Sequence, residues 1–242
     1  MRISVQSDRG LVREQNEDYV GVWELPSSGL LFAVADGMGG HERGEVAASL
    51  AVITLWETFR KGDGREWGEL MEEAFQRANR RIYRLARRRR HIMGTTLTAA
   101  LVHRTVSGEA ELVVGHVGDS KAYLLRGGVF WQLSRDHSVV GELMRNGGLS
   151  EWEAKRHPQR HLLTRALGVE WVVEVDVHRE RIWPGDIVLL ATDGLSNLVS
   201  APEIREIVLS GREDFPSLAP RLCRLANDRG GYDNVSVVAV EV

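Results

Sequence analysis

Short apolar runs that end in an aspartate beside a glycine recur along this 242-residue chain. The runs, each with the residues that follow it, are 31–35 before Asp36-Gly37-Met38-Gly39-Gly40, 112–117 before Gly118-Asp119-Ser120, and 187–192 before Asp193-Gly194. Apolar runs of this length, bounded by glycine, are typical of buried strands. The pattern therefore predicts several strands that carry a carboxylate at their end.

The rest of the hydrophobic pattern predicts helices and further strands. Apolar residues at helical spacing indicate helices over 44–60 and 66–90, a capped helix from 201, and another over 218–226. Strand-like segments lie within 1–25 and at 95–102, 111–117, 121–126, 129–133, 172–177, 187–191 and 235–240. We expect the three strands between 111 and 133 to be linked by hairpins, because only short turns separate them, so the sheet is antiparallel.

Residues 136–165 are more polar and predict short helices and loop outside the main sheets. Ser150 followed by Glu153 has the spacing of a helix N-cap. Strands come in groups, then two helices, then strands again, without regular βαβ alternation. This order predicts an α+β fold with antiparallel sheets. Because no repeat or linker stands out, we expect a single domain over residues 1–242.

The composition argues against several classes of protein. A formal net charge of −3 argues against a general nucleic-acid or anionic-membrane binder. No apolar run approaches the ~18–20 residues of a membrane span, and the N-terminus lacks the apolar region of a signal peptide. The one cysteine, Cys223, excludes an intramolecular disulfide and predicts a reducing, cytoplasmic location. Its apolar helical context predicts a buried hydrophobe.

The helix predicted over 66–90 ends in Arg87-Arg88-Arg89-Arg90. One interpretation is a solvated helix end whose cations favour the negative end of the helix dipole. The other is a docking patch for an acidic partner. The sequence leaves both open.

Five aspartates border predicted strands: Asp18, Asp36, Asp119, Asp193 and Asp233. Asp-Gly is common in turns, so each of these positions alone indicates no more than a turn. Together they predict a hard cation, because such ions prefer converging carboxylates. Nothing indicates thiolate or paired-histidine ligation, so Mg²⁺ or Mn²⁺ is favoured over zinc, and five carboxylates are enough for two ions.

These aspartates belong to a longer series of short motifs. In chain order the motifs are Ser7-Asp8-x-Gly10-x-x-Arg13-x-x-Asn16-Glu17-Asp18, Asp36-Gly37-Met38-Gly39-Gly40-His41, Gly94-Thr95-Thr96, Gly118-Asp119-Ser120, Leu163-Thr164-Arg165-Ala166-Leu167-Gly168, Thr192-Asp193-Gly194 and Asp233-Asn234. With these motifs the chain resembles the metal-dependent protein phosphatases of the PP2C (PPM) type, in their compact bacterial form, over about residues 4–240.

The resemblance implies a central β-sandwich of two antiparallel sheets flanked by helices, in four layers αββα. It also implies a centre of two Mg²⁺ or Mn²⁺ ions at one end of the sandwich, with Asp36 bridging the ions and a third site at Asp119 and Asp193. The implied ligands are Asp18 (mainly through water), Asp36, Gly37 (through its carbonyl), Asp119, Asp193 and Asp233, with Glu17 as a ligand or the neighbour of one.

The resemblance also implies how substrate is held. Arg13 matches the arginine that grips the substrate phosphate, and a guanidinium offers phosphate two parallel donors. Its alternative role is a surface ion pair with Glu14 or Glu17. Residues 136–165, the flap segment, match a mobile flap beside the site. Lys121 follows Gly118-Asp119-Ser120 where the family often has arginine.

The motifs do not identify the general acid that protonates the leaving group. Many family members carry histidine directly after Asp-Gly, and this chain has Met38 there. His41, three residues further on, is a candidate because imidazole titrates near neutral pH. The alternative is a structural hydrogen bond that fixes the glycine loop. We expect the other histidines to be solvated or structural, and among them His161, within the flap segment, is a candidate for substrate contact.

The leading hypothesis is a monomeric enzyme that hydrolyses phosphoserine and phosphothreonine on proteins and opposes a Ser/Thr kinase. Two ions ~3.5–4 Å apart would activate a water for direct attack on phosphorus, without a phosphoenzyme. One alternative is a catalytically silent module of the same fold that binds phosphoproteins. Another is a phosphatase for small phosphorylated metabolites. Neither nucleic acid nor a membrane is expected as a partner.

Overall fold

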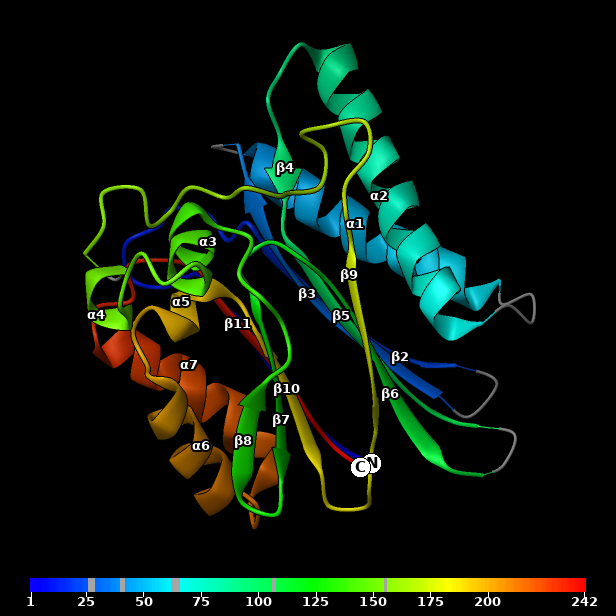
Figure 1. Ribbon diagram of the computed structural model, residues 1–242, viewed down its shortest axis with the longest axis vertical. Helices are drawn as coiled ribbons and strands as arrows, with labels where there is room; N and C mark the ends of the chain where they lie inside the picture. The colour runs from blue at the N-terminus through cyan, green and yellow to red at the C-terminus, as the bar shows by residue number, and fades with distance from the viewer. Residues whose placement is uncertain (26–28, 40–41, 62–65, 106–107, 155) are drawn as a thin grey trace.

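The computed structural model describes residues 1–25, 29–39, 42–61, 66–105, 108–154 and 156–242 (Figure 1). Two antiparallel sheets form its centre. The five-stranded sheet has the order β1 (Arg2–Asp8), β11 (Val235–Glu241), β10 (Ile187–Ala191), β7 (Lys121–Arg126) and β8 (Val129–Gln132). The six-stranded sheet has the order β2 (Asp18–Leu25), β3 (Gly29–Met38), β5 (Leu97–Arg104), β6 (Ala110–Val117) and β9 (Asp176–Arg181), with β4 (Gly94–Thr95) paired to the end of β3.

The two sheets pack face to face, and the sequence of β3 is apolar throughout because both faces of this strand are buried. Alternate side chains of a strand point to opposite faces of its sheet. Leu30, Phe32 and Val34 join the apolar layer between the sheets, together with Val188 and Leu190 of β10. The residues between them on β3 face the helices on the outer side. A strand buried on both faces reads as a continuous apolar run.

Helices cover both outer faces of the sandwich (Figure 1). Against the six-stranded sheet lie α1 (Glu42–Arg60) and α2 (Trp67–Arg89). Against the five-stranded sheet lie α5 (Asp193–Ser196), α6 (Ala201–Ser210), a 3₁₀ turn (Phe215–Ser217) and α7 (Leu218–Asp228). The capping box of Ser200 and Glu203 starts α6, as the sequence predicts. Cys223 is buried on α7, also as predicted. The α+β fold of four layers αββα is confirmed.

The predicted hairpin between 111–117 and 121–126 is wrong. β6 pairs with β5 and β9 in one sheet, whereas β7 pairs with β8 and β10 in the other. The chain crosses between the sheets at Gly118, whose φ of +116° favours glycine and where a Cβ would lie 2.5 Å from the Thr96 side chain. The crossing places Asp119 at one end of the sandwich, between the two sheets.

The predicted strand 172–177 is displaced along the chain. The ladder with β6 runs from Asp176 to Arg181, so residues 172–175 lie outside it. Side chains of α2 bind this stretch instead, since Asn79 donates to the carbonyl of Trp171 and Gln76 to that of Val173. The predicted strand 95–102 is also interrupted, between β4 and β5 at Thr96.

The flap segment carries α3 (Val139–Arg145) and α4 (Glu151–Ala154) outside both sheets, as its polar sequence predicts. Ser138 caps α3, and the Ser150 hydroxyl donates to Glu153 at the start of α4. The segment joins the rest of the fold through a backbone bond from the amide of His137 to the carbonyl of Gly118. In the part of the chain that the structure describes, no helix is long and apolar enough to span a membrane.

Candidate active site

Two of the predicted carboxylates meet across a strand pair. Asp18 begins β2 and lies directly opposite Asp36, near the end of β3. The next residue, Gly37, packs so closely that a Cβ would lie 2.1 Å from the carbonyl oxygen of Gly44. This close approach explains why glycine follows Asp36, and it brings Gly37 and Glu17 together, with the Gly37 amide donating to the Glu17 carbonyl at 3.2 Å.

Hydroxyl groups hold these carboxylates in place. The Thr96 hydroxyl accepts from the amide of Asp36 at 2.9 Å and lies 3.0 Å from the hydroxyl of Ser120, beside Asp119. The Thr192 hydroxyl donates to Asp18 Oδ2 at 2.8 Å and so links β2 to the start of α5. The interruption of the strand at Thr96 thus serves to fix the main chain that carries Asp36.

The remaining carboxylates come from the five-stranded sheet. Asp193 follows β10 at the first residue of α5, where its Oδ2 accepts from Asn197 at 3.0 Å. Asp233 precedes β11, and its neighbour Asn234 binds the N-terminal loop. Both sheets therefore contribute acidic side chains to the same end of the sandwich.

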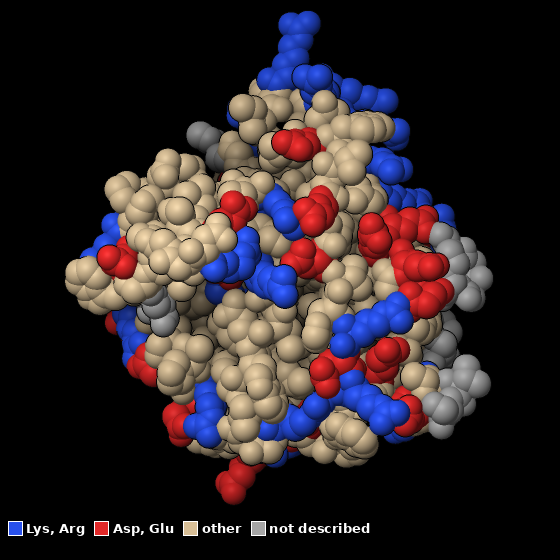
Figure 2. Space-filling model, in the orientation of Figure 1, with Lys and Arg blue, Asp and Glu red and all other residues tan. Residues whose placement is uncertain are grey.

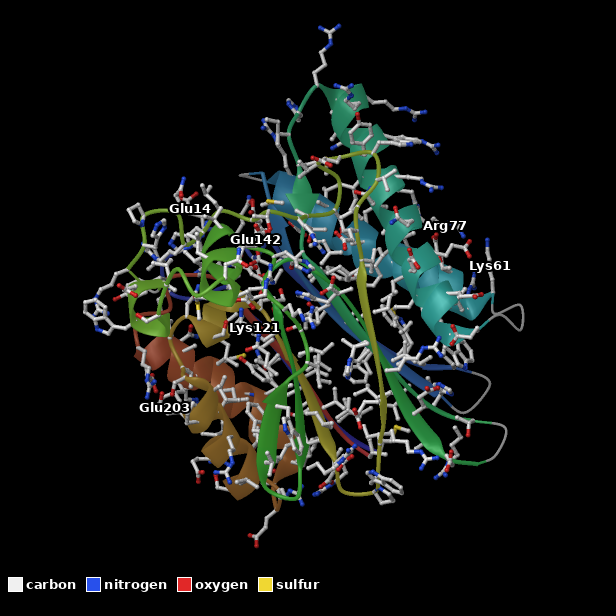
Figure 3. All side chains as sticks on the ribbon, in the orientation of Figure 1. Glu14, Lys61, Arg77, Lys121, Glu142 and Glu203 are labelled. Carbon is white, nitrogen blue, oxygen red and sulfur yellow. The ribbon has the colours of Figure 1, made fainter. Side chains whose placement is uncertain are left out.

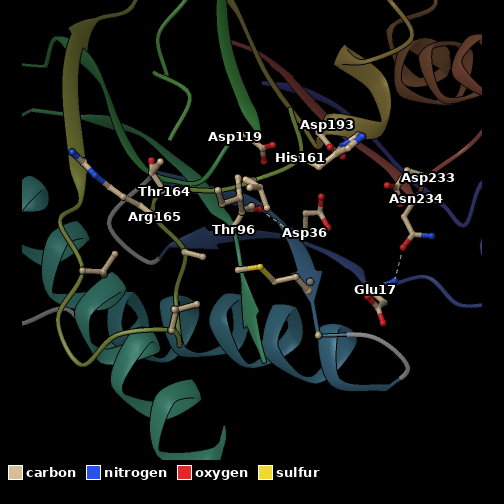
Figure 4. A pocket seen from close by; sticks show the side chains of 18 of the residues that line it. Glu17, Asp36, Thr96, Asp119, His161, Thr164, Arg165, Asp193, Asp233 and Asn234 are labelled. Atoms are coloured by element: carbon tan, nitrogen blue, oxygen red, sulfur yellow. Dashed lines mark hydrogen bonds between the residues drawn. The ribbon is translucent and has the colours of Figure 1, made fainter. Parts of the chain in front are cut away.

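These side chains surround one cavity of about 930 Å³ (Figure 4). The predicted site residues that line it are Arg13, Glu17, Asp36, Gly37, Asp119, His161, Asp193 and Asp233. Asp18 lies outside the cavity lining, with 5% of its surface exposed. His41 lies outside the described residues. Residues 161–165 of the flap segment, Ala166, and residues 169, 170 and 172–174 also line the cavity.

The carboxylates repel one another in a poorly solvated place. Burial raises the pKa of Asp36 well above its usual range, and the charges of Asp18 and Asp193 raise it further. Burial likewise raises the pKa of Asp18 to about 7 and that of Asp119 to about 7, with the neighbouring carboxylates adding to both. The pKa of Asp193 is raised by burial and by Asp233. A nearby positive charge would stabilise the ionised form of these carboxylates.

Two buried carboxylate oxygens of this set, Asp18 Oδ1 and Asp193 Oδ1, have no hydrogen-bond partner among the described atoms. A buried anionic oxygen without a partner is costly, so these atoms fit a hard cation, whose preferred ligands are carboxylate oxygens. Within the described residues, no group of three or more Asp, Glu, His or Cys side chains already has the arrangement of a metal cluster. All these carboxylates except Asp18 line one cavity, and the individual ligand roles stay predictions.

Arg13 lies at the rim of the cavity and is about half exposed. Its Nη2 donates to Asp233 Oδ2 at 2.7 Å. This pair replaces the alternative partners, Glu14 and Glu17, that the sequence left open. A guanidinium has five N–H donors, and this bond uses one of them, so further donors remain for a phosphate at the rim.

Two supporting residues, Asn234 and Lys121, have roles that the sequence did not predict. The Asn234 side chain donates to the carbonyls of Arg9 and Gln15 at 2.8 and 2.9 Å and accepts from the amide of Glu17. It therefore holds both ends of the loop that carries Arg13. Lys121 donates to the carbonyl of Asp119 and to Asp136 Oδ2, both at 2.7 Å, and so ties the cavity to the flap segment.

The buried histidines prove structural, as expected from the sequence. His116 Nε2 lies 3.0 and 2.9 Å from the carbonyls of Gly118 and Arg135, while Nδ1 lies 2.8 Å from the Thr98 hydroxyl. Burial and the nearby His137 lower the pKa of His116 to about 3, so the ring is neutral and donates from Nε2. The ring holds the crossing at Gly118 against the base of the flap segment.

Known proteins share this architecture over the whole chain. The sequence profile of the family described as protein phosphatase 2C matches residues 11–234. The serine/threonine phosphatase stp of Listeria monocytogenes is 38% identical and covers 100% of this chain and 96% of its own. The structure of a Streptococcus agalactiae serine/threonine phosphatase has a TM-score of 0.91 at 34% identity, covering 100% of this chain and 99% of that one. The catalytic domain of the phosphatase PstP, in complex with two manganese ions, has a TM-score of 0.86 at 36% identity and covers 99% of this chain and 97% of its own.

The fold and the acidic cavity, with these likenesses, define a metal-dependent phosphatase of four layers. The chain belongs to the protein phosphatase 2C family. The family, the fold class and the enzyme class predicted from the sequence are confirmed.

Proposed function

We propose that this chain hydrolyses phosphoserine and phosphothreonine on proteins and so opposes a cognate Ser/Thr kinase. The observation that carries the proposal is the pair of buried, unpartnered oxygens of Asp18 and Asp193 beside a cavity that also holds Arg13. The names of the relatives support the substrate class, since each is a serine/threonine phosphatase. The monomeric state and the single domain over 1–242 belong to the same proposal.

The ligands we propose for two Mg²⁺ or Mn²⁺ ions are Asp18, Asp36, Gly37, Asp193 and Asp233, with Glu17 beside them and Asp119 at a third site. Bound there, the ions would lower the pKa of water and neutralise charge on the phosphoryl oxygens. The chain's own part is to present hard, anionic oxygens from both sheets at fixed positions. Thr96 and Thr192 fix two of those positions through the bonds described above.

Arg13 is proposed to bind and orient the phosphate. Its ion pair with Asp233 holds the guanidinium in the lining of the cavity, where N–H donors remain for a phosphate. The exposed His161, also in the cavity lining, is proposed to contact the substrate, and the flap segment to act as a mobile flap. The proposal that His41 is the general acid rests on the motif alone.

The test is hydrolysis of a phosphothreonine peptide and of an aryl phosphate with Mn²⁺, by the wild type and by Asp36→Ala and Asp193→Ala. We expect both variants to lose turnover, with Asp228→Ala, an exposed carboxylate on α7, as the matched control. Equal rates in all four proteins would overturn the proposal. A preference for sugar phosphates over phosphopeptides at equal concentration would indicate a metabolite phosphatase. Phosphopeptide binding without Mn²⁺ binding or turnover would indicate a silent binding module.

A further inference from the structure

The outer face of α2 carries an unusual density of positive charge. Residues 74–108 contain nine arginines and no Asp or Glu, in a chain whose formal net charge is −3. We define the arginine surface as the four exposed side chains of α2 at helical spacing, Arg80, Arg84, Arg87 and Arg88. Figure 2 shows Lys and Arg side chains gathered along the upper right edge of the molecule, where Figure 1 places α2, and Figure 3 shows side chains projecting from this helix near Arg77.

Glu72 and Glu73 lie in the same groove as Arg80 and Arg84, but the described residues show no ion pair between a carboxylate and the arginine surface. The nearby Arg81 differs, since it pairs with Glu57 at 2.6 Å. Like charges three and four residues apart on a helix repel one another by a few tenths of a kcal/mol, about 0.2–0.5 per pair. The surface is therefore available to an anionic partner.

Stabilisation of the helix end explains only part of this pattern. The favourable effect of cations on the helix dipole fades beyond the last turn. Arg87 and Arg88 lie in that turn, but Arg80 and Arg84 lie before it. The dipole therefore accounts for two of the four charges. Arg84 has a ring contact with Trp171, so among the described residues Arg80 is left with neither explanation.

The same helix builds a wall of the cavity. Asn79 of α2 donates to the carbonyls of Glu170 and Trp171 at 3.0 and 3.1 Å and accepts from the amide of Gly168 at 2.7 Å. The guanidinium of Arg84 lies over the ring of Trp171, 5.3 Å from its centroid. The residues on either side of Trp171, namely 169, 170 and 172–174, line the cavity. One segment of chain thus separates the arginine surface from the candidate active site.

We propose that the arginine surface docks an acidic segment of the phosphoprotein substrate while its phosphorylated residue occupies the cavity. The inference rests on the proposed function and narrows its substrate class to proteins with Asp, Glu or further phosphates near the scissile phosphate. Guanidinium groups bind carboxylates and phosphates with two parallel donors, which suits such a segment. Because the chain is acidic overall, the surface supplies the local attraction that an acidic substrate needs. Because α2 also binds the chain segment that lines the cavity, the arginine surface lies beside the candidate active site. This position favours a substrate over a lipid surface as the partner that the arginine surface binds.

The experiment compares peptides that share one phosphothreonine core. Each carries a tail of four Glu or four Gln, joined by Gly-Ser linkers of three, six or nine residues, which reach up to roughly 10, 20 and 30 Å. With Mn²⁺ at low salt we expect kcat/KM to be about tenfold higher for the Glu tail at one or more linker lengths, through KM. At about 0.5 M NaCl this advantage should largely disappear, because exposed charges are screened.

The variant Arg80→Gln/Arg87→Gln removes two charges from the surface, and Arg221→Gln/Arg224→Gln removes two exposed charges from α7 on the far side of the sandwich. We expect the first variant to lose most of the Glu-tail advantage and the second to keep it. Both should hydrolyse the Gln-tail peptide and an aryl phosphate at wild-type rates, which also shows that they are folded.

Docking on this surface would be overturned if the Glu tail gave no advantage at any linker length. It would also be overturned if both double variants lost the advantage equally. A lipid surface would replace the substrate as the occupant if Arg80→Gln/Arg87→Gln weakened binding to phosphatidylglycerol vesicles while the peptide tails made no difference. If the wild type hydrolyses neither the Gln-tail peptide nor the aryl phosphate with Mn²⁺, the proposed function itself fails. The two failures are therefore distinguishable.

Discussion

The carboxylates of the cavity and the arginines of α2 are both clusters of like charge, but burial makes them different. Asp18 and Asp36 lie at the end of the sandwich, where burial raises their pKa values and the charges of neighbouring carboxylates raise them further. Arg80 and Arg88 point into solvent, where water and salt screen their repulsion. The buried cluster suits a small, hard cation held by fixed oxygens, whereas the exposed one suits an extended anion held loosely.

Asp36→Asn should have the largest effect, because it removes a carboxylate that we propose as a ligand of the ions. We expect the rate with Mn²⁺ to fall by more than about a hundredfold, since even residues behind metal ligands cost ~10–100-fold. The increase in melting temperature on adding Mn²⁺ should also shrink. Phosphopeptide kinetics and a thermal melt with and without Mn²⁺ measure both. A variant that keeps the full Mn²⁺-induced shift would remove Asp36 from the ligand set.

Arg13→Ala should have the second largest effect. It should weaken binding of the substrate phosphate more than binding of the metal ions. We expect KM to rise by about tenfold with a smaller change in kcat, because the guanidinium contacts phosphate before reaction as well as during it. Arg13→Lys should recover part of the loss, since an ammonium keeps the charge but not the parallel donors. The Mn²⁺-induced shift in melting temperature should shrink less than in Asp36→Asn, because Arg13→Ala leaves every proposed ligand carboxylate in place, Asp233 included. Unchanged KM and kcat/KM would end this role.

The pH dependence of stability tests the buried charge of Asp18. The folded protein binds more protons than the unfolded chain between the usual pKa of 3.8 and the raised value of about 7. Its free energy of unfolding without metal should therefore fall as the pH rises through this window. Asp18→Asn should flatten the fall and stabilise the metal-free protein at about pH 8 by roughly 2–4 kcal/mol. Urea melts at several pH values in chelator measure this, and a wild-type stability that rises with pH would contradict it.

Arg88→Gln should have the smallest effect and completes the comparison. It removes one charge from the exposed cluster, so the free energy of unfolding should change by less than about 0.5 kcal/mol at low or high salt. The same urea melts, beside those of Asp18→Asn, measure the contrast between exposed and buried repulsion. A large increase in the free energy of unfolding for Arg88→Gln would contradict this comparison, because it would show that repulsion within the arginine surface destabilises the fold as the buried carboxylates do.

Local sequence predicted what depends on local pattern. The continuous apolar run of β3 and the aspartates at strand ends are visible in short windows, and motif order then indicated that these aspartates meet. The arginine run on α2 was likewise visible, although the sequence alone left its role open. The helices α1 and α2 were placed within two residues of their ends.

Contacts between distant segments could not be predicted in the same way. Asn234 binds the loop at Arg9 and Gln15 across more than two hundred residues, and a short window holds no sign of it. The crossing at Gly118 looks like a hairpin because short turns and sheet changes use the same residues. The displaced strand β9 depends on amides of α2 that bind carbonyls of residues 171 and 173. Tertiary contacts decided these features.

The most direct test of the central claim is anomalous diffraction from crystals grown with Mn²⁺. We predict manganese peaks at the end of the sandwich, enclosed by Asp36, Asp193 and Asp233. Peaks confined to other parts of the surface, or a cavity without manganese at saturating concentration, would contradict the account.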